Sequence, residues 1–139
     1  MDKYVLLVVP SEGYSGIAHI TFDAILKENS IDLVTASSVA GAVKADDNSS
    51  SIMTMDFTTV LNHEAEFAGV VIIGGELISD LLANQDLAKI LTDLNSSGGL
   101  IVALDKSVKV IEELGISGNN VITSEGNYEQ IAENVVSRF

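Results

Sequence analysis

The sequence has no cysteine and no tryptophan, and its 139 residues include a single proline. Without cysteine the chain can form no disulfide, no thiolate metal site and no thiol nucleophile. Positive charge is also scarce, because seven lysines and arginines stand against twenty acidic residues, a formal net charge of −13. Phosphate backbones and anionic membrane surfaces bind basic patches, so we expect neither nucleic acid nor membrane as a partner.

The sequence also lacks a segment that reads as a signal or an anchor. The N-terminal apolar run, residues 4–10, is too short to span a bilayer and is followed by Ser11 and Glu12 rather than by a small-residue cleavage site. It is typical of a first β-strand instead. Together with the lack of cysteine, this predicts a cytoplasmic protein.

Apolar residues are abundant. They make up 47% of the chain, and the mean hydropathy is +0.35. This composition excludes a disordered chain, and the length fits one globular domain over residues 1–139.

Aliphatic runs alternate with segments of helical spacing along the chain. Runs of this kind are typical of strands buried on both faces of a parallel sheet. The pattern predicts a flavodoxin-like α/β three-layer sandwich, with helices on both faces of a mostly parallel sheet. The expected strands are residues 4–9, 32–36, 69–73, 100–104 and 121–123, and the expected helices are 17–29, 78–94, 107–114 and 128–139. Residues 37–51, rich in Ser, Ala, Gly and Asp, are expected to form a short β excursion or a loop.

In such a sheet the functional site lies beyond the carboxyl ends of the strands. This rule selects the loops 11–16, 74–78 and 105–108, with 124–128 at their border. Their side chains are rich in carboxylates and nearly free of positive charge, unlike a phosphate site. The polar and aromatic candidates are Ser11, Glu12, Tyr14, Glu76, Asp105, Lys106, Ser107, Glu125 and Tyr128.

Several strings in the sequence resemble one known family. "VVIIGGE" at 70–76 is similar to the strand and Gly-Gly turn of the ThiJ/PfpI superfamily, which includes the Parkinson-linked deglycase. The segments 98–123, 22–37 and 121–136 resemble its elbow strand and following helix, its first helix and second strand, and its closing strand and last helix. The resemblance implies the family's fold, a Gly74-Gly75 turn and the location of the pocket.

The departures from this family concern its reactive groups. The position that matches the family's nucleophilic cysteine holds Asp105, and the place of the glutamate that hydrogen-bonds the thiol holds Ile17. The segment that carries the family's histidine is absent between 115 and 121. The resemblance therefore implies a short member that lacks the nucleophile and its thiol chemistry.

Three functions remain open from the sequence. The first is a non-catalytic protein that binds a small molecule or regulates a partner as a homo-oligomer, with a homodimer expected and no cofactor. The second is a hydrolase or carbonyl-processing enzyme with Asp105 as base and Glu12 as acid. The third is a flavodoxin-like carrier whose loop 11–16 binds the flavin phosphate, although Glu12 would repel it. The residues expected to line the pocket are Ser11, Gly74, Gly75, Glu76, Lys106, Ser107 and Glu125.

Some candidates also have purely structural interpretations. Asp105 directly precedes an expected helix, which favours an N-cap that accepts backbone N–H groups. Lys106 is expected to be exposed or to pair with Asp105. A magnesium or calcium ion among Glu12, Glu76, Asp105 and Glu125 is a weaker hypothesis, and no metal is expected.

Overall fold

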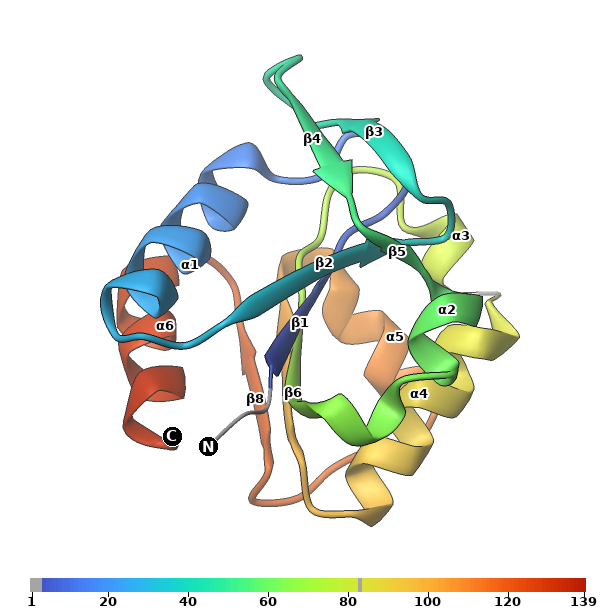
Figure 1. Cartoon of the computed structure of the whole chain (residues 1–139), viewed down its shortest axis with the longest axis vertical. Helices are drawn as coiled ribbons and strands as arrows, with labels where there is room; N and C mark the ends of the chain where they lie inside the picture. The colour runs from blue at the N-terminus through green and yellow to red at the C-terminus, as the bar shows by residue number, and fades with distance from the viewer. Residues whose placement is uncertain (1–3, 83) are drawn as a thin grey trace.

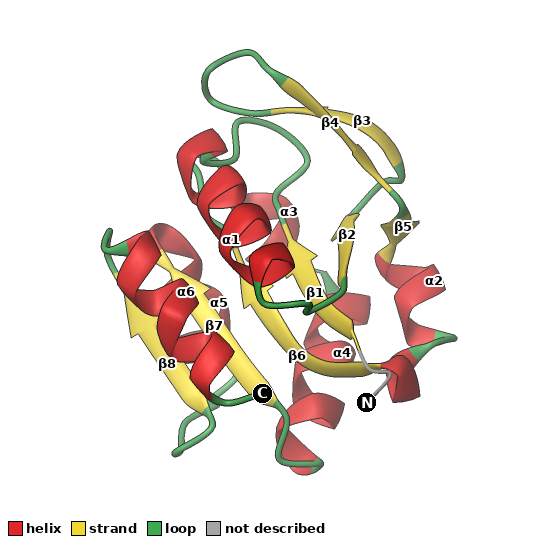
Figure 2. Ribbon diagram, turned by 60° about the vertical axis from the view of Figure 1, so that its left-hand side comes forward, coloured by secondary structure: helices red, strands yellow, loops and turns green. Residues whose placement is uncertain are grey.

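The computed structural model describes residues 4–82 and 84–139. Its centre is a six-stranded sheet in the order β5-β2-β1-β6-β7-β8, in which every neighbouring pair is parallel (Figures 1 and 2). The order places β1 and β6 in the middle, where both faces of the sheet are covered. The strands are β1 (Tyr4–Val8), β2 (Leu33–Ser37), β5 (Met55–Asp56), β6 (Phe67–Ile72), β7 (Leu100–Leu104) and β8 (Val121–Ser124).

Helices cover the two faces of the sheet separately. Helices α1 (Gly16–Glu28) and α6 (Tyr128–Ser137) lie side by side on one face, while α2 (Phe57–Leu61), α3 (Ser79–Leu82), α4 (Gln85–Ser96) and α5 (Val108–Glu113) lie on the other (Figure 1). Alternate residues of each strand point to opposite faces, so Val5 and Leu7 join the α1–α6 core while Leu6 and Val8 join the other core.

The structure confirms the predicted fold class of a flavodoxin-like α/β sandwich. Each predicted strand is present, and its ends lie within two residues of the prediction. The apolar runs identify these strands well because parallel strands that are buried on both faces need apolar residues at every position. Within the described residues, no helix is both long enough and apolar enough to cross a bilayer.

The single helix predicted over 78–94 is wrong. The structure forms α3 and α4 instead, and residue 83 between them lies outside the described part of the chain. Asn84 starts the second helix, because its backbone is extended and its side-chain oxygen accepts the Leu87 N–H at 2.9 Å. Such an N-cap begins a new helix. The sequence prediction also missed β5 and the five-residue α2, which are too short to show a periodicity.

Residues 37–51 contain a β excursion, as one of the two alternatives predicted. Strands β3 (Gly41–Lys44) and β4 (Ser50–Met53) pair antiparallel as a hairpin that projects beyond the sheet (Figure 1). The hairpin is tied to the loop 11–16, because the Gly13 N–H donates to the Lys44 carbonyl at 2.8 Å and the Asp46 N–H to the Tyr14 carbonyl at 2.7 Å.

A buried hydroxyl fastens the carboxyl ends of β6 and β7 to each other. Ser107 is fully buried, and its oxygen lies 2.8 Å from the carbonyl oxygen of Ile72 and 2.7 Å from that of Leu104. The same oxygen accepts the Leu104 N–H at 3.0 Å. Ser107 therefore satisfies backbone groups of two strands that water does not reach.

We expect Ser107→Ala to lower the free energy of unfolding by about 1–3 kcal/mol, because buried backbone groups lose their partner. Urea unfolding followed by circular dichroism measures this. The matched control is Ser137→Ala, whose hydroxyl donates to the Asn134 carbonyl at an exposed position and whose loss we expect to cost far less. Equal costs for the two variants would contradict this role of Ser107.

Candidate functional site

The chain turns sharply at Asp105, where β7 ends and a 3-10 turn, η2 (Asp105–Ser107), leads into α5. The φ angle of Asp105 is +55°, in the left-handed region that residues other than glycine rarely adopt. Aspartate and asparagine tolerate this region better than most residues. The turn is therefore an elbow between a strand and a helix, at the carboxyl end of the sheet.

The carboxylate of Asp105 binds a distant segment of the chain. One of its oxygens accepts the Gly126 N–H at 2.9 Å, and the other accepts the Tyr128 hydroxyl at 2.5 Å. The expectation that Asp105 caps the following helix is wrong, because the left-handed backbone directs the side chain towards the connection between β8 and α6. Both oxygens already have partners within the protein.

Tyr128, the first residue of α6, completes this contact. Burial raises the pKa of its phenol above the usual value, and the hydrogen bond to Asp105 adds to the increase. A hydrogen bond with the Ser15 side chain acts in the opposite direction. The neutral phenol is thus the form that the site favours, since it is the form that can donate to a carboxylate.

The Gly74-Gly75 turn, where β6 leaves the sheet, forms the floor of the same site. A Cβ atom on Gly74 would lie 2.9 Å from the Leu104 carbonyl oxygen, and one on Gly75 would collide with the carbonyl oxygen of Gly13. The Ser15 N–H donates to the Gly74 carbonyl at 2.8 Å. Glycine is required at both positions because backbone segments approach each other too closely for a side chain.

A pocket of about 230 Å³ opens between these segments. Three carboxylates and one cation, the Lys106 ammonium, line it. The ammonium lies 2.9 Å from the Glu76 carboxylate. The predicted pairing of Lys106 with Asp105 is therefore wrong. The contact of Lys106 with Glu76 holds the pKa of the Glu76 carboxyl below its usual range, although the Glu76 side chain is 87% exposed. The lining residues are Ser15, Asp46, Gly74, Gly75, Glu76, Asp105, Lys106 and Tyr128. We call this space the elbow pocket.

The structure brings six of the predicted site residues into the elbow pocket. Each follows the carboxyl end of a strand, where the topological rule placed the site. They are Gly74, Gly75, Glu76, Asp105, Lys106 and Tyr128.

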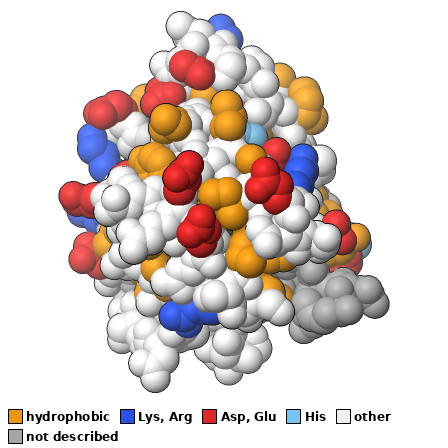
Figure 3. Space-filling model, turned by 90° about the vertical axis from the view of Figure 1, so that its left-hand side faces the viewer, with side chains coloured by type: hydrophobic (Ala, Val, Ile, Leu, Met, Phe, Trp, Pro, Cys, Tyr) orange, Lys and Arg blue, Asp and Glu red, His pale blue; other side chains and the backbone are white. Residues whose placement is uncertain are grey.

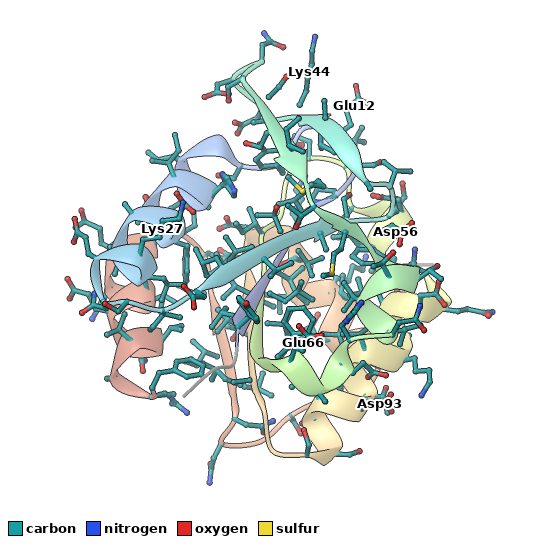
Figure 4. The ribbon with its side chains drawn as sticks, viewed as in Figure 1. Glu12, Lys27, Lys44, Asp56, Glu66 and Asp93 are labelled. Carbon is teal, nitrogen blue, oxygen red and sulfur yellow. The ribbon has the colours of Figure 1, made fainter. Side chains whose placement is uncertain are left out.

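Five other predicted residues do not line this pocket. Tyr14 is buried in the core cluster that packs against α1. The Ser11 N–H donates to Asp80 at 3.0 Å, and Glu12 is exposed near the hairpin, where Figure 4 shows it beside Lys44. Ser107 is buried beneath the turn, and Glu125 is exposed. The predicted acid–base pair of Asp105 with Glu12 is therefore not assembled.

Two lining residues were missed by the sequence analysis. Asp46 comes from the hairpin and accepts the Gly16 N–H at 3.1 Å, a contact between segments thirty positions apart that no local pattern predicts. Ser15 is the N-cap of α1 and accepts the Ala18 N–H at 3.3 Å. A serine just before an apolar helical pattern is a recognisable cap, so this residue had a usable signal. Ile17, which stands at the position of the resembled family's glutamate, does not line the pocket, whereas Ser15 does.

The acidic side chains that the structure describes do not form a cation site. Among the described residues no three His, Asp or Glu side chains come together in a way that could hold a metal ion. The hypothesis of a magnesium or calcium ion fails because Glu12 and Glu125 lie on the exposed surface, outside the pocket that contains Glu76 and Asp105.

The loop 11–16 does not fit a flavin phosphate either. A phosphate needs free backbone N–H groups, but those of Ser11 and Gly16 donate to Asp80 and Asp46. The N–H groups of Gly13 and Ser15 donate to backbone carbonyls. Carboxylates occupy the positions that the phosphate would take, so the flavodoxin-like carrier has no support from this loop.

Comparisons with solved structures find the same fold throughout the chain. A ThiJ/PfpI domain protein from Brachyspira murdochii superimposes with a TM-score of 0.84 at 14% identity, covering 97% of this chain and 96% of that one. Drosophila melanogaster DJ-1beta gives 0.88 at 20% identity over 99% and 90%, and oxidised Toxoplasma gondii DJ-1 gives 0.80 at 18% over 96% and 90%. No protein-family model matches the sequence, and no curated protein matches it significantly.

The architecture and the position of the site define a flavodoxin-like α/β protein with a strand-to-helix elbow at the carboxyl end of its sheet. Within that class the fold is the one shared by the ThiJ/PfpI and DJ-1 proteins. The resemblance predicted from the sequence is confirmed at the level of the fold. The absence of the cysteine nucleophile distinguishes this chain from the family pattern described above.

The raised pKa of Tyr128 predicts a late step in the alkaline titration of tyrosine absorbance at 295 nm. The folded protein favours the neutral phenol of Tyr128, and this preference stabilises the fold. The stabilisation is complete below the ordinary tyrosine pKa of about 10 and is lost as the pH rises through the higher pKa of Tyr128 in the folded protein. We expect Tyr128→Phe to remove the late step and Asp105→Asn to move it to lower pH. A late step that persists in Tyr128→Phe would belong to another tyrosine and contradict the assignment.

Proposed function

We propose that the protein is a non-catalytic ThiJ/PfpI-like protein that binds a small molecule in the elbow pocket and acts as a regulatory homodimer. The most direct support is that the carboxylate of Asp105 is already hydrogen-bonded within the protein. Asp105 stands at the position where the ThiJ/PfpI family has its nucleophile. Its two carboxylate oxygens hold the β8–α6 connection through Gly126 and Tyr128. A group committed to internal hydrogen bonds is a structural anchor.

The elbow pocket remains suited to binding. Its volume of about 230 Å³ accommodates a metabolite-sized fragment, and closely packed backbone segments define its floor at Gly74 and Gly75. Asp46 and Asp105 line it, and the one ammonium is paired with Glu76. This charge distribution favours a polar ligand that offers hydrogen-bond donors over an anion.

The alternative enzyme with Asp105 as base requires another acid, because Glu12 is not in the pocket. The phenol of Tyr128 is the proton donor that the structure places on Asp105. An enzyme of this kind would have to break the Tyr128–Asp105 contact in each turnover. We therefore rank it below the binding protein.

Replacement of Asp105 separates the two functions. We expect Asp105→Asn to lower the free energy of unfolding by about 1–3 kcal/mol, because the hydrogen bonds of a charged acceptor become weaker. We also expect the wild type to convert ester and α-oxoaldehyde probes no faster than buffer does. Turnover by the wild type that Asp105→Asn abolishes would overturn the non-catalytic proposal. The control is Asp86→Asn, at a half-buried aspartate of α4 that accepts the Thr58 hydroxyl at 2.9 Å and does not line the elbow pocket.

We infer the homodimer from an exposed apolar surface of α1. The side chains of Ile17 and Ile20 are 68% and 63% exposed, and their spacing of three residues places them on one side of the helix. Figure 3 shows hydrophobic side chains gathered on the α1–α6 side of the molecule with acidic side chains among them. Apolar patches of this kind are typical of protein–protein contacts.

We expect native mass spectrometry and light scattering to show a dimer for the wild type and a monomer for the double variant Ile17→Glu and Ile20→Glu. Two like-charged carboxylates on each α1 would face their counterparts across the interface and oppose association. The control is Leu77→Glu, an apolar residue that is 58% exposed and lies outside α1. A monomeric wild type, or a dimer that survives in the double variant, would reject this interface.

A further inference from the structure

A second cavity lies far from the elbow pocket, at the amino-terminal half of the central strands. It has a volume of about 240 Å³ and is bounded by β1 and β6 on one side and by α2, α4 and the short turn η1 (Glu64–Glu66) on the other. The elbow pocket, in contrast, lies where β6 and β7 end. The two cavities therefore occupy opposite ends of the sheet, and we call this second one the lower cavity.

The lower cavity is apolar inside and acidic at its mouth. Its described walls carry the side chains of Leu6, Val60, Phe67, Val70, Ile90 and Leu94. Five of these are buried in the core cluster between the sheet and α2 and α4, and Leu94 packs against that cluster. The polar groups that line it are the carboxyls of Glu64 and Asp93 together with Ser97.

The two carboxyls at the mouth interact with each other. Neither is fully buried, and the Asp93 side chain is 40% exposed. Burial, then the neighbouring Asp93 carboxyl, raises the pKa of Glu64, while the Lys89 ammonium, 2.8 Å from Asp93, lowers the pKa of the Asp93 carboxyl. Figure 4 marks Asp93 on α4 beside the η1 turn that carries Glu66.

We propose that the lower cavity binds a small amphiphilic primary amine, with its hydrocarbon chain among the apolar walls and its ammonium group on the carboxylates of Glu64 and Asp93.

The chemistry of the cavity favours this occupant over an acid or an alcohol. An ammonium group has three N–H donors and no acceptor, which complements two carboxylates. It can also lie between the two carboxylates that line the cavity and offset the repulsion between them. An anionic head group would instead face Asp93 directly. The volume is below the range of about 300–1,000 Å³ that is typical of drug-sized ligands, so the cavity suits a single short chain.

The test is a titration of the full ¹⁵N-labelled chain with n-hexylammonium chloride, followed by ¹H–¹⁵N correlation spectra at neutral pH. We expect saturable shifts in residues 60–70 and 90–97, which border the lower cavity, and smaller shifts around the elbow pocket. Each methylene from propylammonium to hexylammonium should tighten binding by about fourfold, as expected when CH₂ groups leave water. Hexanoate at equal concentration should bind at least about tenfold more weakly.

Three variants examine the role of the carboxyls. The double variant Glu64→Gln and Asp93→Asn should weaken hexylammonium binding by about tenfold, because hydrogen bonds to charged groups are lost. Lys89→Gln should strengthen it by up to about fivefold, since it removes an ammonium that already occupies Asp93. The matched control is Glu66→Gln, which neutralises an exposed carboxyl of the same turn that pairs with His63 and does not line the cavity.

Several results would overturn the proposal. Shifts confined to the elbow pocket or to α1 would place the amine elsewhere. Equal affinity for hexylammonium and hexanoate would show that the carboxyls do not select the ligand. Equal affinity for propylammonium and hexylammonium would show that the apolar walls do not contribute. No saturable shift up to the solubility limit of the amine would also reject the site. Circular dichroism of each variant confirms that the fold is retained.

Discussion

The close approach of backbone segments at the carboxyl end of the sheet is the constraint on which the site depends. The Gly74-Gly75 turn, the loop around Gly13 and the end of β7 leave no space for a Cβ atom, and the Ser107 hydroxyl fastens β6 to β7 beneath them. Because these segments pack closely and the Ser15 N–H donates to the Gly74 carbonyl, the loop that carries Ser15 is held next to the elbow at Asp105. The elbow pocket is the space that remains between them.

Aspartate at the elbow combines two properties that the site needs. It tolerates the left-handed backbone of the turn better than most residues, and its carboxylate can accept two donors at once. In this chain those donors are the Gly126 N–H and the Tyr128 hydroxyl, which belong to the connection into α6. The half-buried aspartate at the elbow thus joins β7 to the last helix.

The sequence predicts the parts of this molecule that depend on local pattern. Aliphatic runs identify the central strands, and the rule that sites follow the carboxyl ends of parallel strands places Gly74, Gly75 and Asp105 together. It does not predict Asp46, which reaches the pocket only because the hairpin folds back onto the loop 11–16. It also misassigns Asp105 as a cap, because the direction of that side chain follows from a φ angle set by tertiary contacts.

The two ends of the sheet differ because the elements that cover them differ. At the elbow, loops and the hairpin bring backbone N–H and carbonyl groups together, so that polar side chains must satisfy them. At the other end, α2 is five residues long and the η1 turn follows after two more, so these segments cover the start of β6 with too little side-chain volume to fill the space before α4. The lower cavity results from this deficit. Two carboxyls of like charge line its mouth, so a cation with a hydrocarbon chain would both fill the apolar space and offset their repulsion.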